Sequence, residues 1–190
     1  NYDAFMEPIT WFLTGMEKHS DEFRGDLLGN HESFMGAMSH HMSSFMAPSL
    51  QVSMNELSNH DHSRFLTRTN HQVGRISSRG ADAANEGVNK NLFRMAVLMQ
   101  MTWPGAPTIY YGDEAGLCGW TDPDSRRAYP WGHEAEELIQ YHKELIRILH
   151  EKGFFYMKNS VPKVAAALGI SKNTVYLHLR SIENKEQKEV

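Results

Sequence analysis

The chain has 190 residues, of which 41% are hydrophobic and 22% charged, and its formal net charge is −4. This composition is that of an ordinary soluble globular protein with one domain or two small ones. The single Cys118 excludes a disulfide within the chain, and no run approaches the ~18 apolar residues of a membrane span. The N-terminus shows no basic-then-apolar signal, so we expect a cytoplasmic location.

Four stretches have apolar residues at helical spacing. In chain order they are residues 3–16, 31–49, 89–101 and 134 to about 151. The third is mostly apolar and is expected to be buried, whereas the fourth is amphipathic. Residues 69–87 are rich in Gly, Asn and Ser, and they predict a surface loop that leads into the third helix.

Residues 51–64, QVSMNELSNHDHSR, predict a strand that ends in polar side chains. Val52, Met54 and Leu57 fit a half-buried strand. The groups that follow can hydrogen-bond, titrate or carry charge, and they are Asn59, His60, Asp61 and Arg64. The carboxyl end of a strand is where α/β barrels keep their chemistry. A carboxylate beside an imidazole can bind the vicinal hydroxyls of a sugar, and an arginine three residues on can hold that carboxylate ionised.

Metal binding is an alternative for the histidines. His60 and His62 flank Asp61, and the second helical stretch contains His40-His41-Met42, which are copper-ligand types. The third and fourth ligands that a metal site requires are not evident. Methionines at helical spacing usually fill a core. We therefore expect neither a metal nor a cofactor.

A second polar strand end follows at residues 107–114. Residues 107–111 predict a short buried strand that is closed by Gly112 and followed by Asp113 and Glu114. Three segments, SNHDHSRFLT, PGAPTIYYGDEAG and TDPDSRRAYPWG, resemble in order the strand-seven motif, the strand-eight motif and the following sugar-binding loop of the α-amylase family. The resemblance is to neopullulanase and cyclomaltodextrinase-like glycoside hydrolases, and it covers roughly residues 1–148.

The resemblance implies an α/β fold, in which residues 1–150 form the C-terminal part of a (β/α)8 barrel with about strands 6–8. It implies retaining hydrolysis of α-glucans such as maltooligosaccharides. By family role, Asp61 stabilises the transition state, and the substrate-binding side chains are His60, Asn59, Arg64, Asp122 and Arg126. A strand-end ion pair between Asp61 and Arg64, and a simple turn at Asp122, are the purely structural alternatives.

We expect two of the three catalytic carboxylates of this family to be missing. A retaining glycosidase needs a nucleophile and an acid about 5 Å apart, and the resemblance places both on strands four and five, upstream of the matched motifs. Residues 1–3 look like the end of strand six, and the lack of an initiator methionine suggests a processed or truncated start. We therefore expect this part to be inactive alone, and an incomplete barrel to self-associate through unpaired strand edges.

Residues 151–190 show a different pattern. Residues 161–182, VPKVAAALGISKNTVYLHLRSI, predict two short helices, with Gly169 at the turn and Ser171 as the cap of the second. This is a helix-turn-helix pattern. Residues 152–184 resemble the C-terminal DNA-binding segment of YheO-like transcriptional regulators.

Charge supports a separate module at the C-terminus. Residues 152–190 hold seven Lys/Arg against three Asp/Glu, whereas the preceding residues hold twelve against twenty. DNA binding relies on neutralising phosphates, so the basic tail is the candidate DNA-binding surface. The side chains best placed for this role are Lys172, Asn173, Thr174, Tyr176 and Arg180. A helical hairpin that packs on protein is the alternative.

Three functions remain open from the sequence. The chain is part of a glycoside hydrolase, or a DNA-binding regulator, or a truncated or chimeric product without independent activity. The join between the two patterns lies across residues 144–151, a helix that fits both families.

Overall fold

The computed structural model describes residues 2–153 of the chain. The chain divides into two compact units, Asn1–Leu145 and Ile146–Val190. Of the second unit the structure describes only the end of the last helix, so the predicted helix-turn-helix lies outside the described residues. The elements in chain order are η1 (Tyr2–Met6), α1 (Glu7–Thr14), α2 (His31–Ser44), α3 (Ala47–Leu50), β1 (Met54–Asn55), α4 (Phe65–Arg68), α5 (Ile76–Arg79), η2 (Asp82–Asn85), α6 (Lys90–Thr102), β2 (Ala106–Pro107), η3 (Asp124–Arg126) and α7 (Glu136–Glu151).

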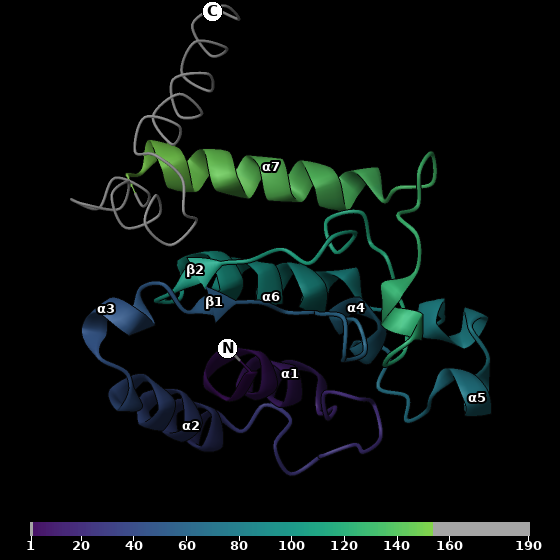
Figure 1. Cartoon of the computed structure of the whole chain (residues 1–190), viewed down its shortest axis with the longest axis horizontal. Helices are drawn as coiled ribbons and strands as arrows, with labels where there is room; N and C mark the ends of the chain where they lie inside the picture. The colour runs from purple at the N-terminus through teal and green to yellow at the C-terminus, as the bar shows by residue number, and fades with distance from the viewer. Residues whose placement is uncertain (1, 154–190) are drawn as a thin grey trace, which may run out of the picture. The chain divides into compact units, whose positions relative to one another are not determined.

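The two strands form a parallel pair, and α6 lies between them in the chain (Figure 1). Met54 pairs with Ala106 and Asn55 with Pro107. A parallel pair joined through a helix is the β-α-β unit of α/β proteins. Both strands lie within or beside the predicted strand segments, but each is only two residues long. Residues 1–3 were expected to end a sixth strand, but Tyr2 and Asp3 belong to the π-helix η1 instead.

The burial along the predicted strand differs in part from the prediction, although Leu57 is buried as expected, at 1% exposed. Val52 and Met54 are 44% and 50% exposed, whereas Asn55 is fully buried. The Asn55 side chain donates hydrogen bonds to the carbonyl oxygens of Trp103 and Pro104, at 3.1 and 3.3 Å. Gly105 permits this approach, because a Cβ there would lie 2.5 Å from the Asn55 amide and because its φ is +141°. The buried side of β1 is therefore fixed by an amide rather than by its apolar residues.

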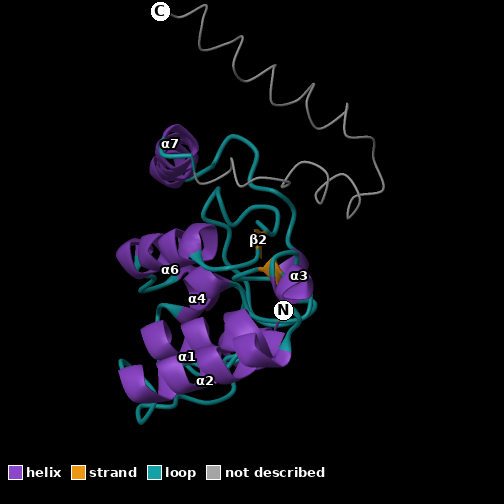
Figure 2. Cartoon of the chain, turned by 90° about the vertical axis from the view of Figure 1, so that its left-hand side faces the viewer, coloured by secondary structure: helices purple, strands orange, loops and turns teal. Residues whose placement is uncertain are grey.

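Helices α1, α4 and α6 gather on one side of the strands and enclose the core (Figure 2). The side chains between them are fully buried or nearly so and include Ile9, Phe65, Leu66, Phe93 and Val97. The predicted helix at 89–101 is confirmed as α6, which begins where the Asn89 side chain accepts hydrogen bonds from the backbone of Asn91 and Leu92. None of the helices in the described part is both long and apolar enough to cross a membrane.

Helix α2 ends at Ser44, five residues before the predicted end. Asn30 caps its start by accepting a hydrogen bond from the Ser33 backbone at 3.0 Å. Phe45 is extended, and a separate turn, α3, begins beside Pro48. A proline favours the first turn of a new helix over the interior of a continuing one, which explains the break.

Arg64 is fully buried and joins three segments of the chain. Its Nη1 donates to the Asp113 carboxylate at 3.0 Å and to the Tyr111 carbonyl oxygen at 2.8 Å, and its Nε donates to the Ser125 carbonyl oxygen at 3.0 Å. Burial raises the pKa of Asp113 to about 6 although Arg64 opposes the shift. The sequence predicted that Arg64 would hold Asp61 ionised and bind substrate. The structure differs, because its guanidinium has no access to solvent and is paired with Asp113.

His62 is also buried, and its ring lies edge-on to the rings of Tyr2 and His19, at centroid distances of 4.9 and 4.8 Å. Its Nδ1 accepts a hydrogen bond from Asn59 Nδ2 at 3.0 Å. Burial lowers the pKa of His62 to about 3, with Arg68 adding a repulsive charge. His62 is therefore a neutral core residue at physiological pH.

Removing Asp113 should destabilise the protein strongly. At pH 7.5, Asp113→Ala leaves the Arg64 charge buried without its partner, and we expect a loss of roughly 3–5 kcal/mol in the free energy of unfolding. The matched control is Asp122→Ala, which breaks an exposed ion pair with Arg126 and should cost less than about 1 kcal/mol. Urea denaturation measures both. Equal losses for the two variants would contradict the structural role of the buried pair.

His62 should make the protein less stable in acid. A histidine with a lowered folded-state pKa contributes stability above its unfolded value of 6.5, and this contribution is lost as the pH falls from 6.5 towards 3. We expect the unfolding free energy of the wild type to fall more steeply over this window than that of His62→Gln. The difference in slope approaches ~1.4 kcal/mol per pH unit. Parallel curves for the two proteins would show that His62 does not take up this proton.

Candidate functional site

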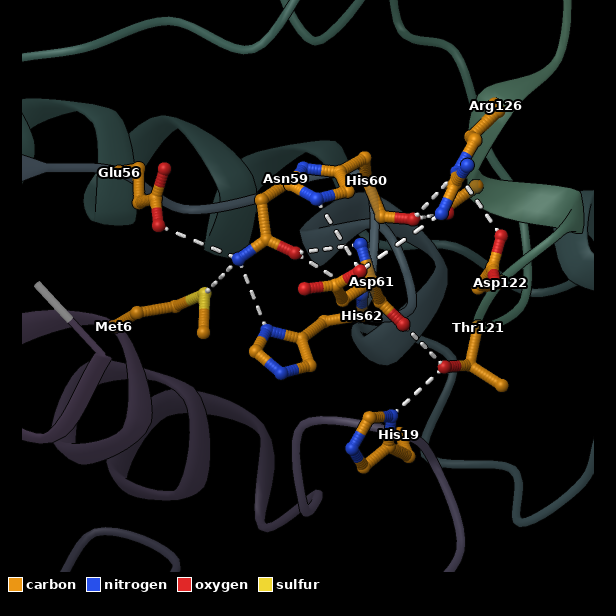
Figure 3. A network of polar contacts seen from close by, with 11 residues as sticks. Met6, His19, Glu56, Asn59, His60, Asp61, His62, Thr121, Asp122 and Arg126 are labelled. Carbon is orange, nitrogen blue, oxygen red and sulfur yellow. Dashed lines mark hydrogen bonds and ion pairs between the residues drawn. The ribbon is translucent and has the colours of Figure 1, made fainter.

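Two loops carry the residues that the sequence predicts for sugar binding, and the structure brings four of them together (Figure 3). His60 and Asp61 follow β1, and their side chains are 60% and 47% exposed. His60 Nε2 lies 3.3 Å from Asp61 Oδ1. The Asp61 carboxylate, a hydrogen-bond acceptor, and the ring nitrogens of His60 are therefore accessible to solvent beyond the end of β1.

Asp122 and Arg126 approach from the second loop. Arg126 Nη2 lies 3.8 Å from Asp61 Oδ1, and its Nε lies 3.0 Å from Asp122 Oδ1. The same Nε donates to the His60 carbonyl oxygen at 3.1 Å. All four side chains remain about half exposed or more, so their polar atoms are available to a ligand. We call His60, Asp61, Asp122 and Arg126 the polar cluster.

Asn59 shapes the loop from within. It is 4% exposed, and its Oδ1 accepts hydrogen bonds from the backbone of Asp61 at 2.9 Å and of His62 at 3.0 Å. Its Nδ2 donates to Glu56 Oε1 at 3.3 Å. An asparagine that bonds its own backbone two residues on forms a tight local turn. Asn59 therefore aims Asp61 outward, and its own amide is used within the loop.

Three anchors of the polar cluster escaped the sequence reasoning. The Thr121 hydroxyl donates to the Asp61 carbonyl oxygen at 2.6 Å, and His19 Nδ1 lies 2.8 Å from the same hydroxyl. The Ser125 hydroxyl donates to the His60 carbonyl oxygen at 2.9 Å. Thr121 and Ser125 belong to the loop segment TDPDSRRAYPWG, so the motif could have pointed to them. His19 gave no signal, because it lies far along the chain from every residue it contacts here.

A pocket of about 370 Å³ opens beside the polar cluster. Its lining includes Tyr2, Met54, Glu56, Asn59, His60 and Tyr110. The mixture of apolar side chains with a few polar groups is typical of small-molecule sites. Glu56 is the carboxylate in this wall, although it is 7% exposed and hydrogen-bonded to Asn59. In the sequence Glu56 lies between Met54 and Leu57 of the predicted strand and was not singled out as a site residue.

Other chemistries find little support in the described residues. No group of three or more His, Cys, Asp or Glu there is placed to hold a metal ion. Cys118 is 3% exposed, and burial raises the pKa of its thiol to about 11, so it is a poor nucleophile at neutral pH. The predicted DNA-binding residues Lys172, Asn173, Thr174, Tyr176 and Arg180 lie outside the described range.

Several known enzymes are similar to this chain over about half of its length. Amylopullulanase of Thermoanaerobacter thermohydrosulfuricus is 39% identical over 104 residues, which is 55% of this chain and 7% of that protein. Neopullulanase 2 of Thermoactinomyces vulgaris is 43% identical over 98 residues, which is 50% of this chain and 14% of that protein. The chain thus spans a small part of the length of the relatives it matches.

Solved structures extend the similarity to the fold. The debranching enzyme from Nostoc punctiforme has a TM-score of 0.54 and 26% identity, and the match covers 76% of this chain and 27% of that one. A cyclomaltodextrinase gives the same TM-score at 25% identity, over 74% of this chain and 20% of that one. These structural neighbours are (β/α)8-barrel enzymes of the α-amylase family.

A family model described as an HTH domain matches residues 138–180. The match begins inside α7, so it includes the helix that the sequence assigned to both patterns. Over about half of its length the chain is therefore homologous to α-amylase-family enzymes, and residues 138–180 match an HTH domain, which confirms both resemblances drawn from the motifs.

Proposed function

We propose that residues 1–150 provide the substrate-binding side of an α-glucan hydrolase site, with β1 and β2 as the seventh and eighth strands of a (β/α)8 barrel. The observation that carries the proposal is the polar cluster, in which exposed carboxylate, imidazole and guanidinium groups meet beyond the end of β1. The similarity to pullulan-degrading and cyclodextrin-degrading enzymes supports the substrate class.

The cluster suits a glucose ring chemically. The Asp61 carboxylate accepts hydrogen bonds from vicinal hydroxyl groups, and His60 bonds the same ring from beside it. A carboxylate there also stabilises the positive charge that develops on the sugar in the transition state. Asp122 and Arg126 hold the next glucose unit. We propose that the nucleophile and the general acid come from outside this cluster, so that the 190-residue chain binds glucan without cleaving it.

Replacing Asp61 should weaken glucan binding. Asp61→Asn keeps the size of the side chain but loses its charge-assisted hydrogen bonds, and we expect maltotriose affinity to fall about tenfold in calorimetric titration. The control is Asp82→Asn, an exposed carboxylate in η2 with the same change of charge, which should leave binding unchanged.

Release of reducing ends from maltotriose by the purified chain would contradict the proposed division of the catalytic carboxylates.

The same samples test self-association, which we propose because large apolar side chains such as Met54 and Ile109 stand exposed beside the unpaired strand edges. Light scattering that reports a monomer would oppose this part of the proposal.

We also propose DNA binding as a second function, carried by the C-terminal segment. The HTH match at residues 138–180 and the excess of four positive charges over residues 152–190 support it. In this proposal Arg180 faces phosphate, and the side chains that face bases are Lys172, Asn173, Thr174 and Tyr176. The acidic remainder of the chain contributes little to DNA affinity.

DNA binding should depend on salt and on the basic side chains of the tail. We expect Lys172→Ala with Arg180→Ala to lower duplex affinity and, because Arg180 is the phosphate-facing side chain of the two, to reduce the slope of log affinity against log salt by about 1. Fluorescence anisotropy with a labelled duplex measures both. The matched control, Lys90→Ala with Arg94→Ala in α6, removes the same charge elsewhere and should have little effect. Equal losses in the two double variants would indicate general electrostatics, and no binding at low salt would remove the second function.

A further inference from the structure

Two aromatic side chains stand in the loop that follows the polar cluster. Trp131 is 79% exposed, the largest value among the large hydrophobic residues of the described part. Its ring centroid lies 4.4 Å from that of Tyr129, with 47° between the ring planes. The two rings are therefore in contact with each other, and Trp131 is open to solvent.

The backbone presents this pair on a tight turn. The His133 N–H donates to the Pro130 carbonyl oxygen at 2.9 Å, which closes a four-residue turn with Trp131 at its tip. Gly132 follows with a φ of +77°, which suits the third position of such a turn. The Trp131 N–H also donates to the Tyr129 carbonyl oxygen at 2.9 Å. Trp131 is thus directed outward by local hydrogen bonds and by the choice of Pro and Gly.

The start of the same loop is held firmly. Arg127 donates to the Asp124 carboxylate at 3.0 and 2.7 Å, and Asp124 in turn accepts from the Trp120 backbone at 2.8 Å. The Tyr111 hydroxyl donates to the Arg127 carbonyl oxygen at 2.8 Å. These contacts tie the aromatic pair to the loop that carries Asp122 and Arg126. Trp131 follows Arg126 by five positions, so their Cα atoms lie within about 18 Å of each other.

Folding does not explain the exposure of Trp131. An indole that stays in water contributes little hydrophobic stabilisation, and tryptophan and tyrosine are enriched at binding interfaces. The C–H groups of a glucose ring form apolar faces, and these pack on the electron-rich face of an aromatic ring. Both the polar cluster and the aromatic pair are parts of one anchored loop, which favours a single extended ligand over two unrelated ones.

We propose that Trp131 and Tyr129 form a stacking platform for the further glucose units of an α-glucan chain whose end is held by the polar cluster. The inference rests on the proposed function and extends it, because it makes the site selective for chain length. Short oligosaccharides reach the polar cluster alone, whereas longer ones also cover the indole ring.

The experiment compares maltotriose with maltoheptaose by calorimetric titration of the 190-residue chain. We expect Trp131→Ala to weaken maltoheptaose binding about tenfold and to change maltotriose affinity by less than about twofold. Trp131→Phe should restore most of the loss, because it keeps an aromatic face. The control Met46→Ala removes an apolar side chain that is equally exposed, at 77%, and should leave both affinities unchanged. Maltoheptaose should also shift the tryptophan fluorescence of the wild type but not that of Trp131→Phe.

The outcomes separate the two proposals. Unchanged maltoheptaose affinity in Trp131→Ala, together with weaker binding in Asp61→Asn, would overturn the platform and leave the proposed function standing. Loss of self-association in Trp131→Ala at unchanged glucan affinity would also overturn it, since the aromatic pair would then serve a protein contact. If the wild type binds neither oligosaccharide, the proposed function fails and the platform fails with it.

Discussion

The guanidinium group of Arg64 carries its charge where solvent does not reach, and the geometry of the polar cluster depends on how that charge is satisfied. Asp113 supplies the opposite charge, and the carbonyl oxygens of Tyr111 and Ser125 accept the remaining hydrogen bonds that the structure records. The rings of Tyr110 and Tyr111 lie 4.5 and 4.9 Å from the guanidinium carbon. Because desolvating an arginine costs several kcal/mol, these partners have to stay in place. The loop after β1, the segment after β2 and the loop around Ser125 are thereby locked together.

In the polar cluster the backbone holds the loop in place, and the side chains remain free for a ligand. The carbonyl oxygens of His60 and Asp61 are bound by Ser125 and Thr121, while the side chains of His60 and Asp61 remain exposed. The amide oxygen of Asn59 accepts hydrogen bonds from the backbone N–H groups of the same turn. A binding group held through its main chain keeps its side-chain atoms free for a ligand, which is the arrangement that preorganised sites require. This support makes the cluster a better candidate than a set of surface charges that meet by chance.

Sequence reasoning located the motifs and the longer helices but overestimated the strands and misjudged which side chains are buried. The helix at residues 89–101 and the polar strand ends were predicted because periodicity and turn residues act locally. Arg64 was assigned to Asp61 and the ligand because it follows Asp61 by three residues, whereas its partner in the structure, Asp113, lies on a distant segment. Val52 and Met54 were expected on the buried side of the strand but are 44% and 50% exposed, because the amide of Asn55 decides which side of β1 faces inward. Contacts between distant residues, such as His19 with Thr121, leave no local pattern to read.

The contact between His19 and Thr121 determines where the imidazole carries its proton. The Thr121 hydroxyl has one hydrogen and gives it to the Asp61 carbonyl oxygen, which has none to offer in return. The hydroxyl therefore accepts from His19, so the neutral ring is the Nδ1–H tautomer. The hydrogen bonds from His19 through Thr121 to the backbone of Asp61 thus run in one direction, and each group in this chain donates to the next.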